Sequence, residues 1–560
     1  MKETLSKERK AGIEEGYIPK WYTTQGWQMF KSAYSVNDEE AVVGRFMAIA
    51  KTLSKYMPNS EHYQKVFFNM MWDGVLSPAS PVLANVGTTR GMPVSCSGQY
   101  VDDSVVSFFD NIKTTALLSK NGFGTSANLS SIRHRGEKIS NGGKSNGAVP
   151  IAELFFQTAN TISQGGNRRG AVAVYLDIEH GDFDELCDLI LHHPDGKNVG
   201  WIIRDSFSAK LQAEDEESNR RYTKMLFTKL VTGKGYMFFP DKVNRHRPEA
   251  YVNNGLEVNA SNLCSEITLH SSVEYDFSCI LSSLNLVHYD RLMTGDDIFN
   301  ATIFLDCLCS YFIEVSEGVE GMEKVRNFTI KGRAIGLGVM GWHTYLQENR
   351  IPYVSLEAHM KDIAFFKRLQ SESLRASKYL AEIHGEPEWC KGLGIRNTHR
   401  TALAPTKSTS ILMGGVSESM FPDPGMVFDI ESSKGQLRRI TPAFYELMKE
   451  RGVYNEKTLN RIATNNGSVQ NEDWLTDDEK LVFLTAYEID NEIIRNRTSI
   501  RQKHICQGQS LNFYLPEDGC EDKISELISK CITDENIFSQ YYAYSKSGVT
   551  VKDECISCQG

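Results

Sequence analysis

The sequence lacks several features that would assign it to a class at once. No window approaches the roughly 18 consecutive apolar residues of a membrane-spanning helix. The first residues, MKETLSKERKAGIEEGYIPKW, are charged and contain no apolar core of a secretory signal. Basic side chains number 61 against 71 acidic ones, so a basic face for nucleic-acid backbone is not expected. We therefore expect a cytoplasmic protein with no membrane or nucleic-acid partner, although the charge leaves single nucleotides open as ligands.

Length and cysteine content set the next limits. The chain has 560 residues, 41% of them hydrophobic and 24% charged, which excludes a small disulfide scaffold and a disordered chain. This length suits roughly three or four domains, or one large domain with attachments. Without a secretory signal, the twelve cysteines should be mostly free thiols. Six lie in apolar or helical-looking stretches and are expected to be buried: Cys187, Cys307, Cys309, Cys390, Cys520 and Cys531.

Hydrophobic periodicity predicts a helical region followed by alternating strands and helices. Residues 1–75 carry apolar side chains at three- and four-residue spacing. Farther on, 105–121 and 149–163 are predicted as helices and 169–178 as a buried strand. Such alternation is typical of a parallel or mixed sheet covered by helices, so the predicted fold class is α/β.

Several short motifs are misleading when taken alone. GLGVMG at 336–341 has the spacing of a dinucleotide-binding turn, but the segment before it is weakly strand-like, and Glu357, near the required distance, lies in a helical pattern. GGKS at 142–145 lacks the first glycine of a P-loop, because position 138 is Lys138. The His- and carboxylate-containing segment 180–193 matches no zinc or two-metal pattern, and we predict no metal site.

CISC at the end of the chain is a lone C-x-x-C pair, Cys555 and Cys558. Structural zinc requires four ligands, and no second pair is present to complete them. A dithiol that cycles with a disulfide on a mobile tail fits better, and the alternative is an inert tail with two surface thiols.

The segment NLCSEI at 262–267 places an amide, a thiol and a carboxylate close together. In a strand, with its period of two residues, Asn262, Cys264 and Glu266 would project to the same side. Burying such groups unpaired would cost free energy, so their grouping favours a reaction site suited to radical or acid–base chemistry.

From about residue 70 onward the chain resembles the large, catalytic subunit of ribonucleotide reductase. The motifs that carry the resemblance occur in the family order: LSPASPVLANVGT (76–88), VSC (94–96), DDS (102–104), NGFGTSANLSSIRHRG (121–136), SNGAVPIAELF (145–155), QGGNRRGAVAVYL (164–176), SNLCSEI (261–267), CILSSLNL (279–286), RAIGLGVMG (333–341), APTKSTS (404–410), SESMFP (417–422) and QSLNFYL (509–515). The resemblance implies a small helical domain (1–75), a ten-stranded α/β barrel (76–545) and a flexible redox tail (546–560). It also accounts for GLGVMG as part of that fold.

The resemblance implies a role for each candidate catalytic residue. Cys264 would become the thiyl radical that abstracts the 3′-hydrogen of a ribonucleoside diphosphate. Glu266 would take the 3′-hydroxyl proton, and Asn262 would hold the substrate hydroxyls. Cys96 and Cys279 would supply two electrons by forming a disulfide, with Cys96 protonating the departing 2′-hydroxyl.

The radical source and the external reductant also follow from the resemblance. Tyr541 and Tyr542 are similar to the pair that passes a radical from a separate, metal-containing small subunit, which indicates class I. The alternative is an adenosylcobalamin-dependent, class II enzyme, which does not need that pair. Cys555 and Cys558 would carry reducing equivalents from thioredoxin or glutaredoxin.

Binding residues are implied in the same way. The substrate-binding candidates are Ser80, Ser95, Pro405, Thr406, Ser408, Thr409 and Ser410. Asp103, Ser104 and Arg133 would bind a dNTP or ATP effector near the interface of a homodimer. The Gly-rich segments 136–147 and 164–170 would relay effector identity to the active site.

The sequence departs from many relatives at its N-terminal side. Cys96 comes too early to leave room for both a helical domain and the nucleotide-binding cone of about a hundred residues that many relatives carry. We predict a short form of the bacterial or phage type with no cone and no dATP shut-off through it. No cofactor beyond nucleotide effectors is expected in this chain. A catalytically dead regulatory relative would be expected to lack Cys96, Cys264, Cys279 or Glu266, and all four are present.

Overall fold

The N-terminal part of the chain is helical, as predicted. The computed structural model describes residues 2–37, 41–140, 142–164, 168–432, 435–515 and 521–545. The first helices are α1 (Lys2–Glu14), α2 (Thr24–Met29), α3 (Val42–Ser54) and α4 (Ser60–Trp72), with a short π-helical turn at Phe30–Tyr34. After α4 the chain turns at Gly74, whose φ of 75° suits glycine, and enters strand β1 (Leu76–Pro78).

A seven-stranded sheet forms one wall of the barrel, in the order β15-β8-β7-β6-β3-β2-β9. Its strands are β2 (Cys96–Tyr100), β3 (Gly124–Asn128), β6 (Val172–Asp177), β7 (Asn198–Ile202), β8 (Tyr236–Phe238), β9 (Phe277–Ser278) and β15 (Ser539–Gln540). The pairs from β2 through β8 are parallel, whereas β9 and β15 pair antiparallel at the two edges. This arrangement confirms the α/β class expected from the alternation of strands and helices.

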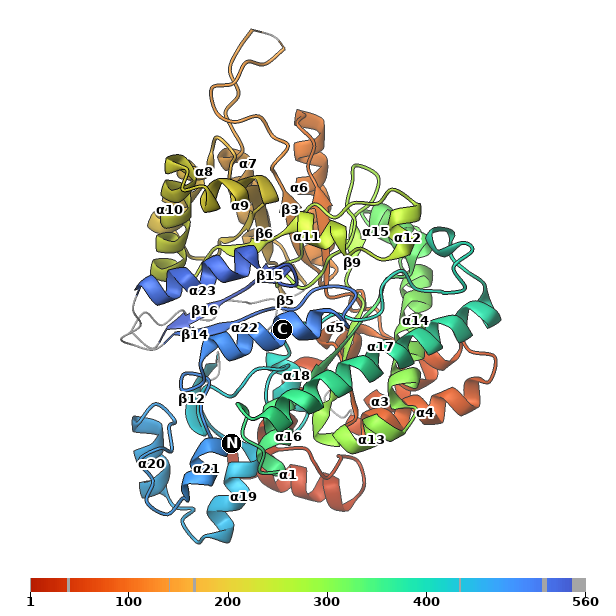
Figure 1. Ribbon diagram of the computed structural model, residues 1–560. Coiled ribbons are helices and arrows are strands. Elements are labelled where there is room, and N and C mark those ends of the chain that lie inside the picture. Colours follow the sequence, from red (N-terminus) through yellow and green to blue (C-terminus); the bar gives the residue numbers. More distant parts are fainter. Residues whose placement is uncertain are drawn as a thin grey trace.

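Helices cover the outer side of this sheet (Figure 1). The covering helices are α6 (Val105–Lys120), α7 (Val149–Thr161), α8 (Phe183–His192), α9 (Asp205–Gln212) and α10 (Glu216–Thr232). Helix α6 packs on β3 and α7 on β6. Residues 136–140 and 142–147 extend away from the barrel beyond these helices, as the orange loop at the top of Figure 1 shows. Two short strands, β4 (Ser163–Gln164) and β5 (Arg168–Arg169), pair antiparallel at the second Gly-rich segment.

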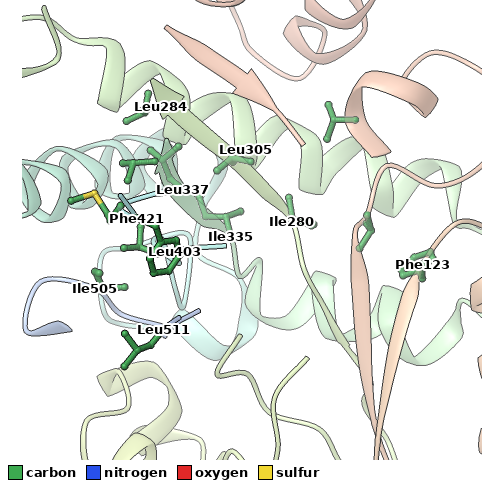
Figure 2. Close-up of a cluster of buried hydrophobic side chains, with 14 of the residues drawn as sticks. Phe123, Ile280, Leu284, Leu305, Ile335, Leu337, Leu403, Phe421, Ile505 and Leu511 are labelled. Atoms are coloured by element: carbon green, nitrogen blue, oxygen red, sulfur yellow. The ribbon is translucent and has the colours of Figure 1, made fainter. Parts of the chain in front are cut away.

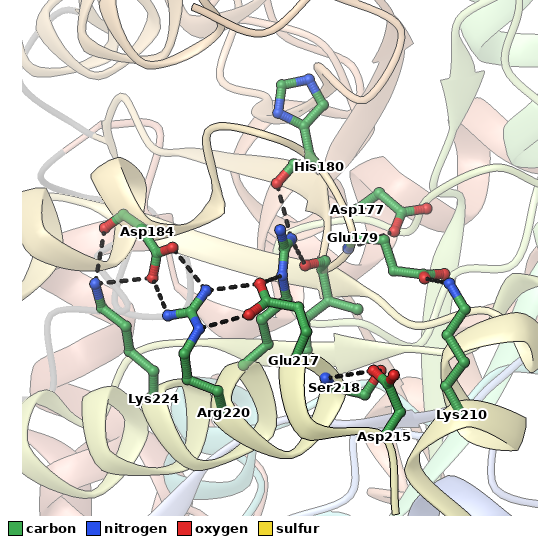
Figure 3. A network of polar contacts seen from close by, with 12 residues as sticks. Asp177, Glu179, His180, Asp184, Lys210, Asp215, Glu217, Ser218, Arg220 and Lys224 are labelled. Atoms are coloured by element: carbon green, nitrogen blue, oxygen red, sulfur yellow. Dashed lines mark hydrogen bonds and ion pairs between the residues drawn. The ribbon is translucent and has the colours of Figure 1, made fainter. Parts of the chain in front are cut away.

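Ion pairs on the surface link α10 to α8 (Figure 3). Arg220 contacts both Asp184, at 2.8 Å, and Glu217, at 2.7 Å, and Lys224 lies 3.0 Å from Asp184. The hydrogen bond from Arg220 lowers the pKa of Asp184 to about 2. Because these groups are largely exposed, each pair contributes only about 0.2–1 kcal/mol, and the network mainly fixes the register of the two helices.

The opposite wall of the barrel is built around β10 (Leu281–Asn285) and β11 (Gly336–Met340), which pair in parallel, with β1 antiparallel to β10. Parallel bridges from Leu337 to Thr401 and from Leu403 to Gln509 continue this wall. A Cβ at Gly338 would lie 2.6 Å from the Ala402 carbonyl oxygen, so glycine is needed for the close approach of these segments. GLGVM is therefore a buried strand and not a phosphate-binding turn.

Apolar side chains from this wall and from the helices behind it form the main core (Figure 2). Leu284, Leu305, Ile335 and Leu337 are each 1% exposed or less, and burial of such a side chain stabilises the fold by roughly 1.5–3 kcal/mol. Leu305 belongs to α14 (Asp297–Val315), which packs against α17 (Leu356–His384). In the described part of the chain, α14 is the single helix whose length and composition would suit a membrane span. Its apolar window is 67% buried inside the protein, as expected of a core helix.

Three further groups of elements complete the structure. Around the barrel lie α5 (Ser80–Asn85), α11 (Pro240–Arg245), α12 (Glu249–Asn253), α13 (Tyr289–Thr294), α15 (Glu323–Gly332), α16 (Trp342–Glu348), α18 (Lys407–Leu412), α22 (Asn491–Gln502) and α23 (Glu521–Thr533). Strands β14 (Phe513–Leu515) and β16 (Ala543–Ser545) pair in parallel. A lobe with its own apolar cluster, not foreseen from the sequence, consists of β12 (Val427–Ser432), β13 (Gly435–Ile440), α19 (Pro442–Glu450), α20 (Glu456–Thr464) and α21 (Asp477–Val482).

Candidate active site

Cys264 lies on a buried turn, which corrects the strand predicted for NLCSEI. The segment has no strand pairing, and Ser265 has a φ of 63°, which an extended strand cannot accommodate. The Asn262 side chain stabilises the turn by accepting a hydrogen bond from the Ile267 amide at 3.2 Å. A polar side chain that competes with strand pairing explains why period-two reasoning failed here.

The predicted grouping of amide, thiol and carboxylate nevertheless occurs through this turn. Asn262 Nδ2 donates to Glu266 Oε1 at 3.1 Å and to Cys96 Sγ at 3.4 Å. Ser510 Oγ lies 2.7 Å from the Cys264 carbonyl oxygen and 3.2 Å from Glu266 Oε2. All five side chains are buried, so their polar groups depend on one another for hydrogen bonds.

Cys96 and Cys279 form a disulfide, with their Cα atoms 5.2 Å apart. Cys96 is the first residue of β2, and Cys279 lies between β9 and β10, where the chain passes from one wall of the barrel to the other. The Cys279 amide also donates to the Cys96 carbonyl oxygen at 2.9 Å. The structure thus contains the oxidised form of the predicted pair, beside Asn262.

Tyr541 contacts the Cys264 thiol, and Tyr542 packs against Tyr541. The Tyr541 hydroxyl lies 3.5 Å from Cys264 Sγ, and the centroids of the two tyrosine rings are 4.1 Å apart. Both side chains are buried, 2% and 5% exposed. The Tyr541 amide donates to the Leu511 carbonyl oxygen at 2.8 Å, which holds the pair against the segment leading into β14.

A cavity of about 90 Å³ joins these groups to the predicted substrate residues. Of the seven candidates, six line it: Ser80, Ser95, Pro405, Thr406, Ser408 and Thr409. Ser410 does not line it, and its hydroxyl instead lies 2.9 Å from that of Thr406. Asn262, Cys264, Glu266 and Cys96 line the same cavity, so the described residues place the candidate substrate and reaction groups around one space.

A larger cavity, of about 880 Å³, opens at the carboxyl ends of β2, β3 and β6. It is lined by polar side chains such as Asn128, Asp177 and Glu257, and it contains none of the candidate thiols or tyrosines. The position of the reactive groups, and not cavity size, therefore identifies the candidate active site.

Three residues that shape this site were not predicted from the sequence. Lys407 lines the small cavity and brings positive charge to it, and Ser510 contacts the Cys264 turn. Tyr175 donates its hydroxyl to the Asn262 carbonyl oxygen at 2.6 Å. Burial raises the pKa of Tyr175 well above its ordinary value, and the nearby Glu266 and Cys264 add to that shift. In the sequence Tyr175 is indistinguishable from any aromatic residue of a buried strand, whereas Lys407 stands inside the PTKSTS motif.

The candidate effector residues also lie together, at the start of α6. Arg133 and Asp103 form an ion pair, and the Ser104 hydroxyl accepts a hydrogen bond from the Ser107 amide as the N-cap of the helix. Arg133 Nη1 donates to the Lys138 carbonyl oxygen at 3.2 Å, which connects this group to the loop at 136–140. The tail cysteines, Cys555 and Cys558, lie outside the described residues.

Comparison with known families agrees with this geometry. The barrel domain of ribonucleotide reductase matches residues 94–218, 208–392 and 387–532. The all-α domain of the same enzyme matches residues 20–91. The chain belongs to the ribonucleotide reductase large-subunit family.

Individual ribonucleotide reductases show how the chain relates to the classes of the family. The ribonucleoside-diphosphate reductase large subunit of Frog virus 3 (isolate Goorha) is 30% identical, over 86% of this chain and 90% of that protein. The class Id ribonucleotide reductase alpha subunit of Actinobacillus ureae superposes with a TM-score of 0.87 and 34% identity, covering 95% of this chain and 99% of that one. A vitamin B12-dependent ribonucleoside-diphosphate reductase from Thermoplasma acidophilum is 28% identical, over 89% of this chain and 67% of that protein.

Ribonucleotide reductase membership confirms the predicted fold class, a barrel preceded by a helical domain, and the predicted oxidoreductase activity. It also excludes a dinucleotide-binding turn at GLGVMG, because GLGVM is part of strand β11 of that barrel.

Proposed function

We propose that this chain reduces ribonucleoside diphosphates with a thiyl radical at Cys264. One observation carries the proposal: a single cavity brings Cys264 together with Asn262, Glu266 and Cys96, which is disulfide-bonded to Cys279, while Tyr541 contacts the Cys264 sulfur. A buried site suits radical chemistry because it excludes water and side reactions.

Each step balances with these groups. The Cys264 thiyl takes the 3′-hydrogen atom of the ribose, and Glu266 takes the proton of the 3′-hydroxyl. The 2′-hydroxyl leaves as water with a proton from Cys96, and C2′ takes a hydrogen atom from Cys279. As the disulfide forms, the Cys96 and Cys279 sulfurs have supplied two electrons, and Glu266 returns its proton to the 3′-oxygen. The hydrogen atom then returns from Cys264 to C3′, which regenerates the thiyl. The disulfide of this structure corresponds to the state after one turnover.

The substrate diphosphate would bind at the end of the cavity formed by PTKSTS. Thr406, Ser408 and Thr409 offer hydroxyls there, and Lys407 supplies the positive charge that a diphosphate requires. Ser80 and Ser95 line the same cavity and would contact the ribose or the base.

The radical would come from a separate, metal-containing small subunit, as in class I. The contact of Tyr541 with Cys264 and the close packing of Tyr541 on Tyr542 support this source, because a radical path needs such a row of oxidisable groups. The Thermoplasma relative makes an adenosylcobalamin-dependent enzyme the second candidate. Cys555 and Cys558 would reduce the Cys96–Cys279 disulfide and then be reduced by thioredoxin or glutaredoxin. Such a dithiol cycle fits a reducing cytoplasm, of a bacterium or a phage-infected cell.

Effector binding and dimerisation would occur together at α6. Val105, Val106 and Phe109 expose 68%, 71% and 57% of their surfaces on this helix, beside Asp103 and Ser104. Such an apolar patch is typical of a protein interface. We propose a homodimer through this face, with a dNTP or ATP bound next to it by Asp103, Ser104 and Arg133.

A nucleotide-reduction assay tests the proposed function. Purified protein is supplied with cytidine diphosphate, dithiothreitol and dNTP effectors, in three arms: alone, with a metal-loaded class I small subunit, and with adenosylcobalamin. Deoxycytidine diphosphate formed only with the small subunit supports the class I proposal. Product with adenosylcobalamin alone assigns class II, and no product in any arm overturns the proposed activity.

A further inference from the structure

A third tyrosine, Tyr236, packs against the pair formed by Tyr541 and Tyr542. It is the first residue of β8 and is 1% exposed. Its ring centroid lies 4.6 Å from that of Tyr541 and 5.4 Å from that of Tyr542. The rings of Tyr236 and Tyr542 are perpendicular. Its hydroxyl lies 3.1 Å from the Tyr542 hydroxyl. Tyr236 is therefore in contact with both tyrosines and is hydrogen-bonded to Tyr542.

The Tyr236 hydroxyl has a defined polar setting. It lies 3.4 Å from Oδ1 of Asn198, the first residue of β7, and Lys234 Nζ donates to the same oxygen at 3.2 Å. A buried hydroxyl costs free energy unless it is hydrogen-bonded, so phenylalanine would serve better if the position only filled space. The hydroxyl instead connects Tyr542 to Asn198 of β7, whose side-chain oxygen also accepts from Lys234.

The backbone around Tyr236 is fixed relative to the pair as well. Lys229 Nζ donates to the carbonyl oxygens of Gly235, at 2.8 Å, and of Tyr541, at 2.9 Å. Lys229 is 1% exposed, and burial lowers its pKa to about 7. Next to Tyr236, Met237 of β8 pairs with Gln540 of β15. Two independent contacts thus keep the start of β8 in register with Tyr541.

We propose that Tyr236 is a positioning residue for radical transfer and that its hydroxyl orients the hydroxyl of Tyr542. This inference rests on the proposed function. In the transfer, Tyr541 gives a hydrogen atom to the Tyr542 radical, and Cys264 then gives a hydrogen atom to the Tyr541 radical. Each step moves one electron and one proton, so the direction of the Tyr542 oxygen determines whether it can accept the hydrogen. Tyr236 keeps its own hydrogen and carries no radical.

The variant Tyr236→Phe tests this role in the full enzyme, because it removes the hydroxyl and keeps the ring. A small misplacement of a reacting group reduces rates by up to about 100-fold, so kcat for cytidine diphosphate should fall roughly 10- to 100-fold, with KM unchanged. Tyr251→Phe is the matched control: Tyr251 is buried in the same apolar cluster, and its hydroxyl accepts from the His270 amide, away from the pair. This control should keep the kcat of the unmodified enzyme.

A second measurement needs no small subunit. Difluorotyrosine incorporated at position 542 lowers the phenol pKa into a range that fluorine NMR can follow in the folded protein. Tyr236→Phe removes a donor to the phenolate and should raise the pKa of that residue, whereas Tyr251→Phe should not.

The outcomes separate this inference from the proposed function. If the unmodified enzyme turns over and Tyr236→Phe keeps its kcat within about twofold, a difference below 0.5 kcal/mol in the barrier, the positioning role is overturned. An unchanged pKa at position 542 overturns it equally. If the unmodified enzyme makes no product in any arm, the proposed function fails, whatever the NMR titration shows.

Discussion

Two sets of buried cysteines coexist in this protein, and they differ in what surrounds them. Cys187, Cys307, Cys309, Cys390 and Cys531 are buried free thiols, as predicted, and Cys520 lies outside the described residues. Burial raises the pKa of Cys309 and of Cys531 to about 12, so these thiols stay protonated. Cys264 is 7% exposed and Cys279 only 1%, yet Cys264 lies beside Ser510 and Tyr541, and Cys279 is bonded to Cys96.

The comparison shows that burial alone does not separate structural from reactive thiols. Cys307 and Cys309 lie within α14 in the main apolar cluster, although the buried Asp306 and Arg333 are near enough to influence their pKa. Cys264 lies on an irregular turn, and Cys96 and Cys279 lie at strand ends, so their sulfurs meet one another, Asn262 and Tyr541. Secondary structure determines which neighbours a buried thiol can have, and the neighbours determine its chemistry.

Replacing the central thiol gives the largest expected effect. In Cys264→Ala, product formation should fall below detection in the nucleotide-reduction assay, because no sulfur remains to take the 3′-hydrogen. Thermal unfolding by circular dichroism should stay close to that of the unmodified chain. Measurable turnover in this variant would contradict the assignment of Cys264.

The contact between tyrosine and thiol can be broken without changing the cysteines. Tyr541→Phe should abolish turnover with the small subunit, because phenylalanine cannot donate the hydrogen atom, while effector and substrate binding by calorimetry stay intact. Tyr353→Phe provides the control, since the buried Tyr353 donates its hydroxyl to the Met420 carbonyl oxygen far from the thiol. Equal loss in both variants would argue for a general cost of removing a buried hydroxyl.

Burial raises the pKa of Asp276, a carboxylic acid next to strand β9, as it raises the pKa of the buried structural thiols. Asp276 precedes β9, is 1% exposed, and its Oδ1 has no hydrogen-bond partner among the described residues. Burial raises the pKa of Asp276 to about 7, with a small opposing effect of Lys324. The folded state therefore binds more protons than the unfolded state between about pH 4 and pH 7, and stability falls as pH rises through that window.

Asp276→Asn removes this proton linkage. Above pH 7 the variant should be more stable than the unmodified chain by on the order of a few kcal/mol, and its stability should change less between pH 4 and 7. Urea denaturation at several pH values measures both effects. The exposed Asp195→Asn serves as the control and should leave the pH profile unchanged. A profile for Asp276→Asn that matches the unmodified chain would show that Asp276 is ionised in the fold.

The smallest expected effect comes from replacing one of the buried structural cysteines. Cys309→Ala removes one buried sulfur from α14 and should cost about 1–2 kcal/mol of unfolding free energy, measured by urea denaturation. The kcat should not change. A loss of turnover in this variant, with the fold intact, would remove the distinction between the two sets of thiols.

Local pattern was sufficient where a segment's structure depends on its own side chains. The apolar spacing of 105–121 and 149–163 predicted α6 and α7, and the run at 169–178 predicted β6. The strand predicted for NLCSEI was wrong because the turn there depends on the Asn262 side chain, the positive φ of Ser265 and the distant Ser510. The lobe around α19 to α21 was missed for a similar reason, since its separate apolar cluster becomes visible only once its helices are packed.

The spacing of residues along the sequence could not predict which side chains meet at the site. Cys96 and Cys279 are separated by 183 residues, and no periodicity connects them; the family resemblance suggested the pair. Tyr236 and Tyr175 look like core aromatics in the sequence, and only the structure shows which atoms their hydroxyls meet.

Because Cys279 lies where the chain passes from one wall of the barrel to the other, the disulfide also affects the stability of the barrel. In the oxidised state a covalent tie joins β2 to the segment that leads into the opposite wall of the barrel, and in the reduced state this tie is absent. For a closed loop of this length, chain-entropy estimates give roughly 5 kcal/mol of stabilisation. Each turnover would therefore raise the free energy of unfolding and each reduction would lower it, so that the melting temperature of a sample reports what fraction of its molecules has been re-reduced.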